Sequence, residues 1–263
     1  MSRLDHRLTS YRELLPHPSL RPFVDRFWIS SLPAGAPPRR ILPDGCIDVL
    51  IDLARGGRAL AVGTMTRASV FAPRAPVRIA AVRFRPGGAV PFLRVPAEEL
   101  TDRTLPCADI GARWLAHPSW SEATEPEAAV DSLQRLLLDR LASRDRRQPV
   151  VARAVAALFS REPPSIEALS RDVGWSRQHL ARAFRVHVGV SPKQLARVAR
   201  LQRAVASLQG GAGHGLADLA LGLGYFDQAH MTRDFRALAA VTPIEAGANS
   251  SSIFPIRSLF ADP

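Results

Sequence analysis

The sequence predicts an α+β protein, in which a β-rich N-terminal domain precedes an all-α domain. Three observations lead to this fold class. Short apolar runs separated by Pro and Gly clusters fill the first part of the chain, apolar residues at helical spacing fill the last part, and this last part contains an internal repeat. At 263 residues, of which 46% are hydrophobic, the chain is long enough for two domains with a core each.

Four runs of the N-terminal part have the composition of β-strands, at residues 23–29, 47–53, 59–63 and 77–84. Alternation of apolar and polar residues is clearest in the last run, with one irregularity after which the apolar residues lie on the other face of the strand. Arg83 is expected to point outward. The turn residues between the runs predict a meander or a small barrel.

A helix is predicted after these strands, followed by a domain boundary. Leucines at helical spacing in residues 125–142 predict a helix that packs on the N-terminal domain. The charged run that follows has little to bury and ends at Pro149, which favours a linker. The expected organisation is a β-rich domain with its helix over residues 1–143, a linker over 144–149, an all-α domain over 150–248 and a tail over 249–263.

The repeat in the C-terminal part predicts two helix-turn-helix units. Each copy begins with a short apolar helix ended by Gly174 or Gly224, and a small residue, Ser170 or Ala220, stands four positions earlier. A small side chain lets two helices touch, and glycine adopts the positive φ of the turn. The repeated positions are Ser176, Leu180, Arg182, Phe184, Val190 and Pro192 in the first copy, and Asp227, Met231, Arg233, Phe235, Val241 and Pro243, each 51 positions later, in the second.

The second helix of each unit has an apolar face and a polar face. Ser176 or Asp227 caps this helix, because its side-chain oxygen accepts a backbone N–H of the first turn. Arginine pairs with guanine, glutamine pairs with adenine, and alanine touches the thymine methyl group. We therefore predict that both polar faces bind the major groove of double-stranded DNA, through Arg177, Gln178, Ala181, Arg182 and Arg185 in the first unit and through Gln228, Ala229, Thr232 and Arg233 in the second.

A long helix is predicted between the units. Ser191 and Gln194 have the spacing of a capping box, and Pro192 suits the first helical position. A helix that reaches Leu208 is roughly 24 Å long at about 1.5 Å per residue. With the adjoining packing, this length sets the two reading helices about one DNA turn, ~34 Å, apart.

The charge of the chain points to a polyanionic partner. Its formal net charge is +11, and between Arg171 and Arg203 there are eight basic residues against one acidic residue, Asp172. Because Lys193 is the only lysine, part of this charge reflects an arginine-rich composition. For a single unit, a solvated helical bundle explains the pattern as well as DNA binding does, whereas two copies that share cap, core and turn favour DNA binding.

Residues 150–248 resemble the DNA-binding domain of the AraC/XylS family of transcription regulators. The resemblance lies in SIEALSRDVGWSRQHLARAFRVHVGVSPKQLARVARLQRA and LADLALGLGYFDQAHMTRDFRALAAVTP. It implies that Gln178, Ala181 and Arg182 face bases in the first unit, that Arg177 contacts phosphate, and that RNA polymerase is a further partner. The same resemblance assigns base contacts in the second unit to Gln228, Ala229, Thr232 and Arg233.

The chain departs from this family at Ala240, where members usually have Gly, and Phe usually stands where Tyr225 and Met231 stand. Because of these changes, we expect the first unit to dominate base recognition and the second to anchor or tune it. His230 is expected to make a hydrogen bond in a partly buried position rather than to touch a base.

The N-terminal stretch RILPDGCIDVLIDL resembles a sensor-type domain found ahead of such DNA-binding domains. The resemblance implies control by a small-molecule effector of unknown identity, or by a homodimer formed through this domain. An enzyme or repair module tethered to DNA is the alternative for the N-terminal domain. An AraC-like fold used mainly for protein contacts is the alternative for the whole chain.

No catalytic, cofactor or metal site is predicted. Asp44 and Asp48 flank a Pro-Asp-Gly turn, which explains them better than an acid pair does. Cys46 and Cys107 lack the spacing of a zinc or redox motif and are expected to be reduced and buried. Because no apolar run approaches the ~20 residues of a membrane span and none resembles a signal peptide, a cytoplasmic protein is expected.

Overall fold

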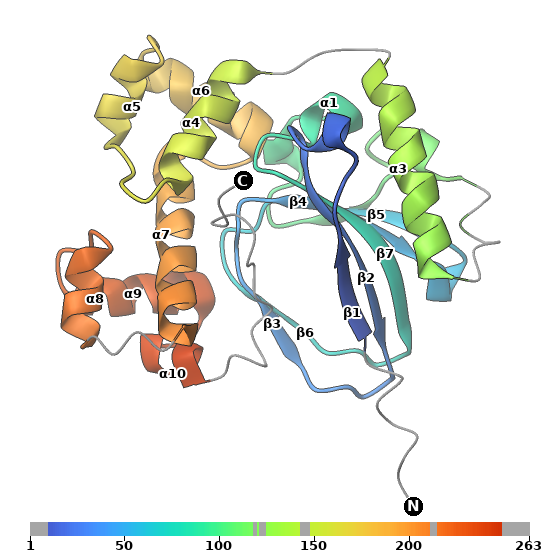
Figure 1. Ribbon diagram of the computed structural model, residues 1–263, viewed down its shortest axis with the longest axis horizontal. Coiled ribbons are helices and arrows are strands. Elements are labelled where there is room, and N and C mark those ends of the chain that lie inside the picture. The colour runs from blue at the N-terminus through green and yellow to red at the C-terminus, as the bar shows by residue number, and fades with distance from the viewer. Residues whose placement is uncertain (1–9, 118–119, 121–124, 143–147, 211–214, 249–263) are drawn as a thin grey trace, which may run out of the picture.

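The computed structural model describes residues 10–117, 120, 125–142, 148–210 and 215–248, with a sheet domain beside a helical domain (Figure 1). The strands are β1 (Ser10–Leu14), β2 (Val24–Leu32), β3 (Arg39–Ile41), β4 (Ile47–Asp52), β5 (Arg58–Val62), β6 (Ser69–Phe71), β7 (Val77–Phe84) and β8 (Thr104–Pro106). The helices are α1 (Val90–Leu93), α3 (Pro126–Ala142), α4 (Pro149–Phe159), α5 (Ile166–Asp172), α6 (Arg177–Val188), α7 (Pro192–Gln209), α8 (Leu216–Gly222), α9 (Gln228–Ala239) and α10 (Pro243–Ala248). The predicted α+β class and the order of its two parts are confirmed.

The N-terminal domain contains a six-stranded antiparallel sheet in the order β1-β2-β7-β4-β5-β8. β1 and β8 are its two edges in the described part of the chain, so the sheet stays open and the barrel arrangement does not form. The predicted helix, α3, covers one face of this sheet, where it contributes Leu133 and Leu137 to the main core (Figure 1). A separate two-stranded antiparallel sheet, β3 with β6, lies toward the other face.

The predicted irregularity in the strand at residues 77–84 is wrong. β7 pairs with β4 in one continuous register, and its side chains alternate regularly, with Ala80, Val82 and Phe84 in the core. Arg83 therefore lies on the opposite face of the sheet, but it does not reach solvent, because it is only 7% exposed. Its ion pairs with two aspartates explain this burial, since a charge leaves water only when it is paired.

α7 forms the centre of the C-terminal domain, with α4, α5 and α6 around one end and α8, α9 and α10 around the other (Figure 1). Each end has its own core, built on Leu180 and Phe184 in the first unit and on Met231 and Phe235 in the second. The predicted linker residues 144–147 and the whole predicted tail, 249–263, lie outside the described residues. No helix in the described part of the chain is long and apolar enough to cross a bilayer.

Candidate DNA-binding surface

The first helix-turn-helix unit is formed by α5 and α6. Gly174 takes the predicted positive φ, +71°, in the turn. Ser170 is buried, and its hydroxyl donates a hydrogen bond to the carbonyl of Trp175, which fixes the chain as it leaves the turn. The Ser176 hydroxyl then accepts the N–H of His179 at 3.2 Å and caps α6.

The second unit, α8 with α9, repeats this geometry. Gly224 has φ +76°, and the Asp227 carboxylate accepts the N–H of His230 at 2.6 Å. The N–H of Tyr225 donates to the Ala220 carbonyl at 2.9 Å, the counterpart of the 3.1 Å bond from Trp175 to Ser170 in the first unit. Tyr225 is therefore the equivalent of Trp175, and the next residue, Phe226, is the extra residue of the second turn.

The two reading helices keep their apolar faces inside and their predicted faces outside. Leu180 and Phe184 of α6, and Met231 and Phe235 of α9, are each fully buried. The predicted DNA-binding residues lie on the outer faces, where Ala181 and Thr232 are partly exposed and Arg177, Gln178, Arg182, Arg185, Gln228, Ala229 and Arg233 are exposed.

The predicted side chains differ in how firmly they are held. Within the described part of the chain, Arg177, Gln178 and Arg182 make no hydrogen bond or ion pair through their side chains, so they are available to a ligand. Arg233 instead donates from Nε to the Ala229 carbonyl at 3.3 Å, and the Thr232 hydroxyl donates to the Gln228 carbonyl at 2.9 Å. These bonds restrain both side chains against the α9 backbone, while the terminal amino groups of Arg233 keep no partner within the described part of the chain.

α7 begins as predicted only in part. The Ser191 hydroxyl accepts the N–H of Gln194 at 3.1 Å, and Pro192 occupies the first turn. The Gln194 side chain does not return to Ser191, as a capping box requires. It accepts from Arg197 at 3.2 Å and donates to the Thr66 carbonyl at 3.5 Å, because the N-terminal domain lies within its reach.

Several of the eight basic residues counted in this region have structural roles. Arg197 binds the buried Asp234 at 2.7 Å and so ties α7 to α9. Arg200 lies 5.0 Å from the Tyr225 ring centre, and Arg203 donates to the carbonyls of residues 160 and 161. Fewer than eight basic side chains are therefore free to bind DNA. The sequence alone does not distinguish arginines in solvent from arginines with a partner in the protein.

The N-terminal domain docks against the C-terminal end of α6. The Thr64 hydroxyl donates to the Val188 carbonyl at 2.6 Å, and the Thr101 hydroxyl donates to the Gly189 carbonyl at 2.8 Å. Glu98 also pairs with Arg185 of the predicted reading face at 3.6 Å. Gly189 is required here, since its φ is +92° and a Cβ would lie 2.7 Å from the Thr101 hydroxyl.

The same domain also contacts the C-terminal end of α9. The N–H of Ala68 donates to the Leu238 carbonyl at 2.6 Å, and Arg40 donates to the Ala239 carbonyl at 3.3 Å. Leu42, from the segment after β3, is buried in the core of the second unit. The N-terminal domain therefore holds the C-terminal ends of both α6 and α9, a connection that the sequence did not indicate.

A third contact joins the N-terminal domain to α7 through the Pro-Asp-Gly turn. The Pro43 carbonyl accepts from Gln202 at 2.6 Å, and Gly45 lies so close to α7 that a Cβ would be 2.5 Å from Cδ1 of Leu195. The Asp44 carboxylate accepts the N–H of Cys46 at 2.8 Å, which fixes the turn.

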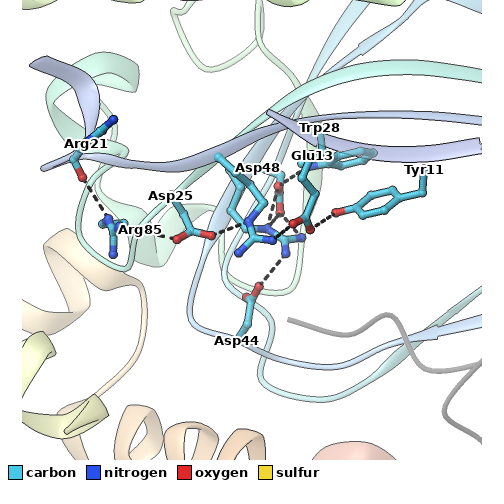
Figure 2. Close-up of polar contacts among 10 residues, drawn as sticks. Tyr11, Glu13, Arg21, Asp25, Trp28, Asp44, Asp48 and Arg85 are labelled. Atoms are coloured by element: carbon cyan, nitrogen blue, oxygen red, sulfur yellow. Dashed lines mark hydrogen bonds and ion pairs between the residues drawn. The ribbon is translucent and has the colours of Figure 1, made fainter. Parts of the chain in front are cut away.

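Figure 2 shows the buried charges that hold this turn to the sheet. Arg83 lies between Asp48, at 3.1 Å, and Asp44, at 3.6 Å. On the neighbouring strand Arg26 pairs with Asp25 at 2.8 Å and with Glu13 of β1. The cluster thus extends from the edge strand β1 to the turn that contacts α7.

The burial of this cluster shifts the pKa values of its members. Burial alone would lower the pKa of Arg83, but Asp48 and Asp44 raise it well above its ordinary value. Burial raises the pKa of Asp44, and Arg83 opposes only part of this shift. Burial also raises the pKa of Cys46, while the pKa of Cys107 rises to about 12, so both thiols are buried and protonated at neutral pH.

Two protein families match the chain, one in each domain. Residues 12–106 match a domain of unknown function, DUF6597, and residues 169–248 match a helix-turn-helix domain family. The second match begins within α5 and covers the rest of the first unit, α7 and the second unit. The C-terminal part of the chain is an AraC-type DNA-binding domain, and its function is that of a transcription regulator. The prediction made from the repeat and from the family resemblance is confirmed at this level.

Solved structures similar to this chain include a transcriptional regulator with an AraC-type DNA-binding domain from Chromobacterium violaceum, at 29% identity over 38% of this chain and 91% of that chain, with a TM-score of 0.36. The C-terminal domain of AraT, a response regulator from Geobacillus stearothermophilus, is 21% identical over 45% of this chain and 95% of that chain, with a TM-score of 0.36. ToxT from Vibrio cholerae is 11% identical over 91% of this chain and 97% of that chain, with a TM-score of 0.42. No curated protein matches the sequence. The DNA-binding domain is identified by the family match and by the geometry of the two units, and not by the similarity to these solved structures.

The described residues contain no group of three or more His, Cys, Asp or Glu side chains arranged for a metal ion. Asp44 and Asp48, the carboxylates closest to an acid pair, both neutralise Arg83. His230 is partly exposed, and its Nδ1 accepts the N–H of Phe226 at 3.4 Å, in line with the hydrogen-bonding role expected for it.

Proposed function

We propose that α6 and α9 of this regulator enter adjacent segments of the major groove on one side of the duplex and read a two-part site. The observation that carries this proposal is the pair of capped helices, each with a buried apolar face and an exposed face of Arg, Gln, Ala and Thr side chains. α7, with 18 residues, is about 27 Å long at 1.5 Å per residue, a length that suits units one DNA turn apart.

The first unit carries most of the base recognition in this proposal. Gln178, Ala181 and Arg182 point outward from α6 without internal partners for their polar groups, so Arg182 can make bidentate bonds to guanine and Gln178 to adenine. Arg177, at the first position of α6, suits a phosphate. Gln228, Ala229, Thr232 and Arg233 read the second part of the site, more weakly because two of them are held by backbone carbonyls.

Binding of DNA by an Arg182→Ala variant tests this assignment. We expect a loss of about 1–3 kcal/mol in binding to the selected site and a relaxed preference at one base pair. Arg58→Ala, which removes an exposed arginine of the N-terminal domain, is the matched control and should leave specific binding unchanged. If Arg182→Ala weakens binding to selected and random DNA equally, Arg182 does not read a base.

We propose further that the N-terminal domain binds a small-molecule effector between its sheet and the β3–β6 pair. A cavity of about 720 Å³ lies there, within the range of small-ligand sites. Its floor is the apolar sheet face with Leu50, Leu60 and Ile79. Arg67 and Arg74 line it without any partner among the described residues, so the chemistry favours an amphipathic anion.

The route from this cavity to DNA is short. Arg67 lines the cavity, and the next residue, Ala68, donates its N–H to the Leu238 carbonyl at the end of α9. Arg40 of β3 reaches the next carbonyl, that of Ala239. A ligand that displaces β3, β6 or residues 65–68 therefore changes the position of α9 relative to α6.

Binding of 1-anilinonaphthalene-8-sulfonate, a fluorescent amphipathic anion, tests the cavity. Ile79→Trp fills its floor and should abolish saturable binding of the probe. Ile244→Trp, a similar change at an exposed residue of α10, should leave the binding unchanged. Equal binding by both variants would place the probe elsewhere.

A homodimer formed through the N-terminal domain is the second candidate for control. β6 exposes Val70 and Phe71, and an apolar strand edge can pair with a second copy. Sedimentation of the full chain over a range of concentrations, with and without DNA, distinguishes a dimer from a monomer. RNA polymerase is the further partner that transcription control requires.

A further inference from the structure

We infer that Phe226 is an additional base-reading residue, whose ring packs against a thymine methyl group at the edge of the half-site read by α9. This inference rests on the proposed binding of α9 to DNA. Phe226 is 84% exposed, the highest value among the exposed large hydrophobic side chains of the described residues, so its ring is open to contact with a ligand.

The backbone around Phe226 is held on both sides, so its exposure results from a defined turn. The preceding residue, Tyr225, is 3% exposed, belongs to the core of the second unit and donates its N–H to Ala220. The following residue, Asp227, caps α9, and the N–H of Phe226 itself donates to Nδ1 of His230.

The comparison of the two units shows how this ring reaches the surface. In the first unit a single residue, Trp175, separates Gly174 from the cap Ser176, and its ring lies 4.4 Å from the ring of His179. In the second unit Tyr225 takes the corresponding internal position, and its ring lies 5.4 Å from the ring of His230. The extra residue therefore adds an aromatic ring on the outside of the turn.

The Phe226 ring lies at the N-terminal end of α9, and this is the end through which a recognition helix contacts base edges. Phe226 immediately precedes the cap, next to Gln228 and Ala229, and the N-terminal residues of a recognition helix are those that contact bases. The thymine methyl is the apolar group of the major groove, and phenylalanine is among the side chains that contact it.

The N-terminal domain cannot be what covers Phe226. Its contacts with α9 are made at Leu238 and Ala239, at the far end of a 12-residue helix about 18 Å long. No basic side chain lies between Phe226 and Ala229, so no side chain in this segment offers a positive charge to a phosphate. An apolar contact with a base is the interaction that the Phe226 ring can add to those of Gln228 and Ala229.

Deoxyuridine substitution tests this inference, because it removes the methyl group of thymine and keeps the base pair. On the duplex selected by the full chain, each thymine is replaced in turn, and the wild type and Phe226→Ala are titrated by fluorescence anisotropy. We expect one position at which the wild type loses about fourfold in affinity, the equivalent of ~0.8 kcal/mol for one methyl group. Phe226→Ala should bind the parent duplex about fourfold more weakly and should no longer respond at that position.

Leu221→Ala, at a residue of the same unit that is 62% exposed, is the matched control and should behave as the wild type at every position. Unchanged affinity of Phe226→Ala, or an undiminished response to deoxyuridine, would overturn the inference. So would full DNA affinity combined with a loss of transcription by purified RNA polymerase, which would assign Phe226 to a protein contact. A wild type that selects no sequence would instead refute the proposed function, and this inference with it.

Discussion

Replacing Glu98 by Gln tests whether a docking contact of the N-terminal domain competes with DNA. Its carboxylate pairs with Arg185 at 3.6 Å, and the two side chains are 44% and 50% exposed. If DNA binding uses Arg185, the phosphate backbone and Glu98 compete for the same guanidinium. Glu98→Gln should therefore increase DNA affinity.

The size of this effect follows from the exposure of the pair. An exposed ion pair contributes at most about 1 kcal/mol, so the gain in affinity should not exceed about fivefold at low salt. One additional phosphate contact should also steepen the plot of log affinity against log salt concentration by about 0.9. Fluorescence anisotropy at several salt concentrations gives both quantities.

Glu99→Gln is the matched control, because it makes the same change in net charge one residue away. The Glu99 side chain is exposed and pairs with no residue in the described part of the chain. It should change affinity only slightly and leave the salt slope as in the wild type. Equal effects of the two variants, or an unchanged slope for Glu98→Gln, would refute the competition for Arg185.

Three further predictions concern stability. Ala240 has φ +54°, a left-handed conformation that is strained for alanine and relaxed for glycine. Ala240→Gly should therefore raise the free energy of unfolding by about 1 kcal/mol, measured by urea denaturation. A lower free energy of unfolding in this variant would show that Ala240 is not strained. Arg83→Met leaves Asp44 and Asp48 buried without their cation and should cost about 3–5 kcal/mol in the same assay; a loss below 1 kcal/mol would show that the cluster is dispensable. Because burial raises the pKa of Asp44 in the folded state above the unfolded value of about 3.9, the folded state binds this proton more tightly. The free energy of unfolding of the wild type, relative to Asp44→Asn, should thus fall as pH rises above about 4, and a difference independent of pH would exclude this linkage.

The C-terminal domain was predictable because its signals are local. Ser176, Gly174 and their counterparts Asp227 and Gly224 act on residues within one turn of the chain, so a single sequence contains the information. The same signals located the exposed faces of both reading helices. They also revealed the extra residue of the second turn, but not that Phe226 would point outward.

The N-terminal domain was less predictable because its contacts are distant in sequence. β1, β3, β6 and β8 have three to five residues each, too few for an alternation pattern, and they form only through pairing with other strands. Arg83 was expected in solvent, since nothing near it in sequence indicates that Asp48, 35 positions earlier, neutralises it. The docking of the two domains left no sequence signal either, because many of its hydrogen bonds end on backbone carbonyls and its side-chain contacts, such as Glu98 with Arg185, join residues far apart in sequence.

Selection of bound sequences from random DNA by the full chain tests the central claim most directly. Two reading helices on one side of the duplex predict two blocks of preferred bases, with centres about 10 base pairs apart. The block read by α6 should be the more sharply defined and should lose one position in Arg182→Ala. A single block, or no enriched sequence at salt concentrations that permit binding, would contradict the account.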